Sequence, residues 1–214
     1  MILLPGIQAG PGEMAPLAAV FGPEARVIAL PSSEADRLPA IAAELEATLP
    51  PGAHDFVAAS FGALLVWALP PGRVRSLVAI GALPWRTAAA ARSGRAGAVL
   101  PWLPEAFYRP LYQRRIRASL VADGASPALA DAATPPPRRV LAARLRAIAA
   151  WNLPPRPPAP CAWLWGADDP WVTWTAAEVQ ARGLTPLVVP GRHRPHVERP
   201  EAVAAAIAAW RGGG

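Results

Sequence analysis

The chain has only one cysteine, Cys161, among its 214 residues. A single cysteine excludes an internal disulfide framework, and this fits a reducing compartment. No apolar stretch reaches the ~20 uninterrupted residues that a membrane-spanning helix needs, so we expect no membrane span. The first ten residues, MILLPGIQAG, lack the basic and long apolar regions of a signal peptide and read as an immediate β-strand. Together these features favour a cytoplasmic protein.

Lysine is absent, so all 21 basic residues are arginine, and the formal net charge is +6. The arginines are spread along the chain, with one local cluster at Arg114, Arg115 and Arg117. Nucleic-acid binding would require a basic stripe within a recognisable module, and none is visible, so we expect no nucleic-acid partner. The cluster is interpreted as a solvated helix face. The alternative is a docking patch for an acidic carrier protein or an anionic substrate.

Apolar residues make up 53% of the chain, and many of them fall in six short continuous runs. Continuous runs of this length are typical of strands buried on both faces of a parallel sheet. Segments of helical character separate them, such as residues 32–49, in which Pro39 delays the expected helix start. The alternation predicts an α/β fold with an open, mostly parallel, doubly wound sheet flanked by helices. The runs are Met1–Leu4, Val27–Leu30, Phe56–Ala59, Ser76–Ala82, Cys161–Trp165 and Pro186–Pro190.

One long segment, residues 83–160, interrupts this alternation. It contains no convincing strand but includes the helical run RRVLAARLRAIAAW and ends in a proline-rich stretch, Pro154–Pro160. A structureless connection of this length is uncommon in a compact domain. We therefore predict that residues 83–160 form a helical cap inserted into a core made of residues 1–82 and 161–214.

Candidate catalytic residues follow three of the predicted strands. Ser60 follows the third, Asp168 and Asp169 follow the fifth, and His193 and His196 follow the sixth. Open α/β sheets place their sites at the carboxyl ends of the strands. A serine hydroxyl needs a base to become a good nucleophile, and a carboxylate can orient a histidine that acts as this base. Ser60 alone also fits a structural helix N-cap.

The turn AASFG around Ser60 and the ending PGRHRPHVERPEAV together resemble the α/β-hydrolase superfamily. The first matches its nucleophile elbow, and the second is similar to its common Gly-His-x-Pro-His ending. The order Ser, Asp, His is also the one that this fold uses. The resemblance implies that Ser60 is the nucleophile and His193 the base. It also implies that the acid is Asp169, three residues after Gly166, with Asp168 as the fallback.

The same resemblance implies an oxyanion hole built from backbone N–H groups. Its donors would be Phe61 and either Ile7 or Gln8 in the loop after the first strand. Two residues depart from the family pattern, because Arg192 stands in place of a glycine and Pro5 precedes Gly6 where many relatives have histidine. Candidate substrate-pocket residues are the tryptophans, with core packing as the alternative: Trp85, Trp102 and Trp171.

The sequence therefore predicts a serine hydrolase that cleaves a carboxylic ester or thioester without a cofactor or metal. The expected partner is a small-molecule acyl ester or thioester. One alternative is an esterase for acyl groups on an acidic carrier protein, similar to the pimeloyl-carrier methyl esterases. The other is a catalytically silent scaffold that binds a ligand or partner, which the departures at Arg192 and Pro5 suggest.

Overall fold

The computed structural model describes residues 1–8, 10–82, 88–151, 157 and 159–213. Its centre is a six-stranded sheet in the order β2-β1-β3-β4-β5-β6, in which every neighbouring pair is parallel. This arrangement confirms the predicted open α/β sheet. The strands are β1 (Ile2–Leu4), β2 (Arg26–Val27), β3 (His54–Ala59), β4 (Val74–Ile80), β5 (Cys161–Gly166) and β6 (Thr185–Val189).

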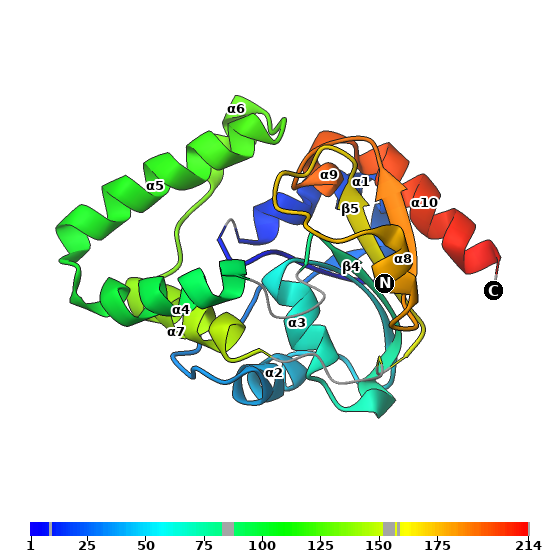
Figure 1. The fold of residues 1–214 in the computed structure, drawn as a ribbon, viewed down its shortest axis with the longest axis horizontal. Helices are drawn as coiled ribbons and strands as arrows, with labels where there is room; N and C mark the ends of the chain where they lie inside the picture. Colours follow the sequence, from blue (N-terminus) through cyan, green and yellow to red (C-terminus); the bar gives the residue numbers. More distant parts are fainter. Residues whose placement is uncertain (9, 83–87, 152–156, 158, 214) are drawn as a thin grey trace.

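Helices cover both faces of the sheet because alternate side chains of each strand point to opposite sides. Ile2 and Leu4 pack into one core with α2 (Leu38–Glu46) and α3 (Phe61–Trp67). Leu3, between them, packs into a second core with α1 (Ala15–Phe21) and α10 (Pro200–Gly212). Figure 1 shows α2 and α3 on one side of the sheet and α10 on the other. Between β5 and the C-terminus lie two short helices, α8 (Ala176–Gln180) and α9 (Pro195–Glu198).

The ends of some elements differ from the sequence-based expectation. The strand expected over Val27–Leu30 is only the two-residue β2, although Ile28 still donates its N–H to the Leu3 carbonyl. Helix α2 begins at Leu38, so Pro39 lies in its first turn, where proline is tolerated. The start of α2 agrees with the expected effect of Pro39, whereas the short β2 differs from the expectation without changing the topology.

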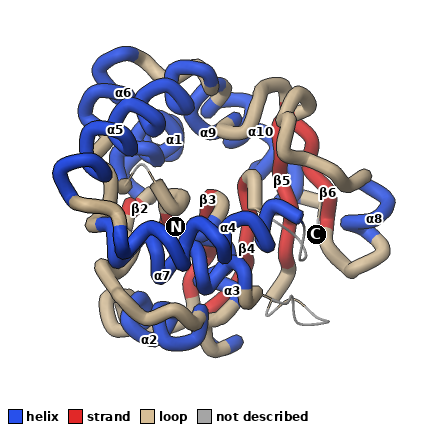
Figure 2. The backbone as a smooth tube through the Cα atoms, turned by 60° about the vertical axis from the view of Figure 1, so that its left-hand side comes forward, coloured by secondary structure: helices blue, strands red, loops and turns tan. Residues whose placement is uncertain are grey.

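Helices α4 (Ala88–Val99), α5 (Glu105–Ala122), α6 (Pro127–Ala132) and α7 (Arg138–Ala149) all lie between β4 and β5 in the chain. The run RRVLAARLRAIAAW forms α7. Helices α4 and α7 lie side by side (Figures 1 and 2), and glycines allow this close approach. A Cβ atom on Gly97 would lie 2.8 Å from the Ala142 carbonyl oxygen.

Most of the expected proline-rich stretch, Pro154–Pro160, falls outside the described residues. No helix in the described ranges is long and apolar enough to cross a membrane.

Candidate active site

Ser60 lies on a sharp turn between β3 and α3. Its φ and ψ are 46° and −113°, and it is the only non-glycine residue with positive φ in the described part of the chain. Its backbone N–H donates to the Ile80 carbonyl at 2.7 Å, which ties the turn to the end of β4. Such strain persists only where the surrounding structure imposes it, and it concentrates at functional sites.

The alternative of a structural N-cap does not match this geometry. Ser60 holds the N-cap position of α3, but its side chain makes no capping hydrogen bond. The turn also requires a small residue two positions later. A Cβ atom on Gly62 would lie 2.6 Å from the Pro5 carbonyl oxygen, so Gly62 lets α3 approach the loop that follows β1. The turn therefore exposes the hydroxyl and leaves it free of local backbone partners.

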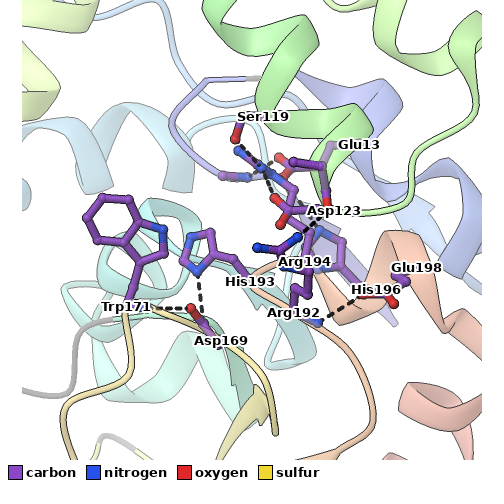
Figure 3. A network of polar contacts seen from close by, with 12 residues as sticks. Glu13, Ser119, Asp123, Asp169, Trp171, Arg192, His193, Arg194, His196 and Glu198 are labelled. Carbon is purple, nitrogen blue, oxygen red and sulfur yellow. Dashed lines mark hydrogen bonds and ion pairs between the residues drawn. The ribbon is translucent and has the colours of Figure 1, made fainter.

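The structure places Asp169, and not Asp168, against His193. Nδ1 of His193 lies 2.9 Å from Oδ2 of Asp169, whose side chain is 1% exposed (Figure 3). The other oxygen of Asp169 accepts the Trp171 backbone N–H at 2.8 Å. Asp168 is exposed and is held only through its backbone, which donates to the Gly191 carbonyl. An ionised carboxylate can only accept hydrogen bonds, so Nδ1 of His193 carries the proton and Nε2 is the basic nitrogen.

His193 and His196 have different surroundings. Gly81, at the end of β4, lies directly against His193, and a Cβ atom there would be 2.9 Å from the His193 carbonyl oxygen. His196 is 1% exposed, and its Nε2 approaches Oε1 of Glu13 within 3.6 Å. His196 is thus buried beside an acidic residue from the other end of the chain.

A cavity of about 200 Å³ brings the predicted residues together. Ser60, His193, Ile7, Gln8 and Trp171 all line it. The ring of Trp171 lies edge-on to that of His193, with centroids 6.4 Å apart.

The other predicted residues lie elsewhere. Phe61 is completely buried beneath the turn and is not among the described lining residues. Trp102 is 84% exposed and lines a separate hollow, so the prediction that it faces the substrate is wrong. Among the described residues, Trp102 belongs to none of the buried core clusters. Trp85 falls outside the described residues.

The loop after β1 is held in place from two sides. The Gly6 N–H donates to Oε2 of Glu13 at 2.9 Å, so Gly6 is not free to bind a substrate oxygen. Arg144 of α7 donates to the Ile7 carbonyl at 3.0 Å, and its guanidinium lies over the Phe61 ring at 5.9 Å. Within the described ranges, the N–H groups of Ile7, Gln8 and Phe61 donate to no protein acceptor. These are the N–H groups that the family resemblance predicts for the oxyanion hole.

Sequence reasoning missed a buried polar network beside the cavity, centred on Arg194 and Glu13 (Figure 3). Nε of Arg194 donates to Oε1 of Glu13 at 2.8 Å, and its Nη1 donates to Ser119 at 2.8 Å and to Asp123. Burial opposes the ionisation of Glu13. The neighbouring His196 and Arg194 and the Gly6 N–H outweigh burial and lower the pKa of Glu13 to about 2.

This network joins three parts of the site. Glu13 holds the loop after β1, Arg194 directly follows His193 in the chain, and Asp123 ends α5. The sequence offers only a slight signal for this network. Glu13 is the one acidic residue in the segment PGIQAGPGEM, and Arg194 directly follows His193.

The family departure at Arg192 leaves the geometry of the histidine loop intact. The preceding residue, Gly191, takes the positive φ of 120° that the turn requires. The Arg192 N–H donates to Oε2 of Glu198 at 2.9 Å. A Cβ atom on Gly166 would lie 2.1 Å from the Arg192 carbonyl oxygen, so the end of β5 packs directly against this loop. This contact sets the loop of Asp169 beside that of His193.

Comparison with known proteins identifies the family and the fold. A family model described as "Alpha/beta hydrolase family" matches residues 3–206. An esterase from Thermogutta terrifontis superposes with a TM-score of 0.71 at 18% identity, covering 99% of this chain and 89% of that chain. A structure from a study of carboxylesterases of Nitrososphaera gargenis gives a TM-score of 0.74 at 14% identity, covering 99% and 89%. The thioesterase domain of the curacin biosynthetic pathway gives 0.66 at 15% identity, covering 97% and 90%.

No curated protein matches the sequence significantly. The likeness to the solved structures concerns the fold. The structure has an open parallel sheet flanked by helices, with the strained serine turn between β3 and α3. With the match over residues 3–206, the chain belongs to the alpha/beta hydrolase family.

Proposed function

We propose that this protein is a serine hydrolase that cleaves a carboxylic ester or thioester through an acyl-enzyme on Ser60. The observation that carries the proposal is the buried Asp169 carboxylate, which accepts from His193 at a cavity that Ser60 lines from a strained turn. Fold alone does not assign a reaction within this family, so the argument rests on the site.

In the proposed mechanism, Nε2 of His193 removes the proton of the Ser60 hydroxyl as its oxygen attacks the substrate carbonyl. Asp169 keeps the proton on Nδ1 and stabilises the imidazolium that forms. Backbone N–H groups of Phe61 and of Ile7 or Gln8 bind the negative oxygen of the tetrahedral intermediate. His193 then gives its proton to the leaving alcohol or thiol. Water, activated by the same histidine, later releases the acyl group.

Two neighbouring aspartates provide a matched test of this proposal. Asp169→Asn lets an amide N–H point at His193 and favours the wrong tautomer, so we expect kcat for a 4-nitrophenyl ester to fall by roughly 10³–10⁴-fold. Asp168→Asn, one residue away on an exposed position, is expected to keep kcat within about threefold of the parent. A burst of nitrophenolate equal to the enzyme concentration would support the acyl-enzyme.

Equal rates for the two variants would contradict the assigned acid. A folded parent that turns over neither oxygen esters nor thioesters would favour the alternative of a catalytically silent scaffold that binds a ligand under its cap helices.

A further inference from the structure

A second cavity of about 490 Å³ adjoins the catalytic cavity and lies between cap helices α4 and α5. Four residues line both cavities: Gln8, Ser93, Leu145 and Trp171. A substrate whose carbonyl lies at Ser60 can therefore extend past Trp171 into this second space. Nothing in the reaction proposed above uses it.

The walls of the second cavity are mostly apolar. Tyr108 and Tyr112 of α5 stack with their ring centroids 5.3 Å apart. Burial raises the pKa of Tyr112 to about 12, although the charge of Arg115 opposes this, so the phenol stays neutral at physiological pH. The aliphatic lining comes from Ala96, Leu100, Leu103, Leu111 and Leu145. Such walls suit an alkyl chain or another apolar group.

Two arginines on different helices, Arg92 of α4 and Arg115 of α5, also line this cavity. Both are exposed, and no ion pair joins either of them to a carboxylate in the described part of the chain. No aspartate or glutamate is among the described lining residues. The cavity thus has two positive charges and no negative one.

Other arginines on the cap helices do have carboxylate partners. Arg109, Arg117, Arg138, Arg139 and Arg146 each lie within 4.0 Å of an aspartate or glutamate oxygen. Arg95, Arg114 and Arg144 have no such partner among the described residues, but they line neither of the two cavities. An anionic group bound in this cavity would give Arg92 and Arg115 the partner that they lack among the described residues.

We infer that the second cavity binds an anionic group of the substrate, separated from the scissile carbonyl by a short apolar linker, and that Arg92 and Arg115 select for it. This inference rests on the proposed esterase or thioesterase function. Guanidinium groups bind carboxylate and phosphate oxygens with paired hydrogen bonds, and the apolar walls between them and Ser60 suit the linker. The substrate class is therefore an ester or thioester that carries a remote carboxylate or phosphate.

Matched esters test this preference with carboxylate as the probe. On the acyl side, the 4-nitrophenyl monoester of adipic acid is compared with 4-nitrophenyl hexanoate. On the alcohol side, 5-carboxypentyl butyrate is compared with hexyl butyrate. We expect kcat/KM to favour the anionic member of one pair by about tenfold or more, mainly through KM. The preference should shrink as salt increases, because the arginines are exposed. Chain-length and phosphate analogues of the favoured pair then define the linker and the anion.

The variants Arg92→Gln and Arg115→Gln are expected to reduce the ratio of anionic to neutral kcat/KM about fivefold each, and the double variant to abolish the preference. Arg114→Gln, on the same helix as Arg115 but outside both cavities, is the control and should keep the parent ratio.

Hydrolysis without any anionic preference, or an equal loss in Arg114→Gln, would overturn this inference and leave the proposed function standing. If the folded parent hydrolyses no member of either pair, and no thioester, the proposed function itself fails.

Discussion

Replacing Glu13 with glutamine is expected to remove a large pH-dependent part of the stability. The pKa of Glu13 is about 2 in the folded protein, against an ordinary value of 4.5. A carboxyl with a depressed folded pKa contributes stability above its unfolded pKa and loses it as the pH falls through the folded one. The difference corresponds to about 3 kcal/mol, of which about 2 kcal/mol is lost between pH 6 and pH 3.

Urea denaturation of the parent and of Glu13→Gln at pH 6, 5, 4 and 3 measures this contribution. We expect the stability difference between the two proteins to shrink by about 2 kcal/mol across the range, because glutamine does not titrate. Asp131→Asn is the control, since Asp131 pairs with Arg117 on an exposed surface. It should cost less than about 1 kcal/mol at every pH. A difference for Glu13→Gln that stays constant from pH 6 to pH 3 would refute the reasoning.

Three further predictions concern stability and reactivity. Ser60 has a strained φ of 46°, and glycine relieves about 1–3 kcal/mol of such strain. Ser60→Gly should therefore melt about 2–6 °C above Ser60→Ala in calorimetry, and equal melting temperatures would rule out strain in the turn. Arg144→Met leaves the partly buried carbonyls of Ile7 and Pro31 without their donor. Urea denaturation should show a loss of about 1–3 kcal/mol, and a neutral result would argue against this anchor. Burial raises the pKa of the Cys161 thiol, so we expect a thiol reagent to label Cys161 only after unfolding. Rapid labelling of the native protein would contradict its burial.

The fold was predictable because its signals are local. Continuous apolar runs such as CAWLWG form β5, which is buried throughout, and this pattern is typical of a parallel strand. The shortest strand, β2, is also the one whose position the sequence predicted least accurately. The run VIAL begins at Val27, whereas β2 ends there, because only one neighbour pairs with this edge strand. Local patterns thus fix the order of elements better than their ends.

The sequence predicted that the segment between β4 and β5 is helical, but it did not predict each helix in it. Helix α7 has an amphipathic pattern and was recognised directly, whereas α5 contains Pro110 and shows little separation of its apolar and polar residues into two faces. Proline inside a helix removes one hydrogen bond, so the sequence argues against a helix there. Tertiary contacts supply what the propensity lacks: Ile116 and Leu120 of α5 pack into a core cluster with residues of α6 and with Val197.

Local sequence patterns likewise predict only part of the candidate site. Ser60, Asp168, Asp169, His193 and His196 could be predicted as neighbours because each follows a strand of a parallel sheet, and the strand ends meet at one edge. The choice of Asp169 and His193 among them came from the family resemblance. Arg194 and Glu13 were missed because they are 181 residues apart and no local pattern joins them. A buried ion pair of this kind depends on the folded arrangement of the loop after β1, the histidine loop and α5, which the spacing of residues does not encode.

Labelling with a fluorophosphonate probe tests the central claim most directly, because this reagent reacts with a serine only when a base and an oxyanion hole activate it. The parent, Ser60→Ala and His193→Ala are treated under native conditions, and the modified peptide is identified by mass spectrometry. The account predicts that the parent is labelled at Ser60 and that both variants lose the label. A well-folded parent that remains unlabelled, or is labelled at another serine, would contradict it.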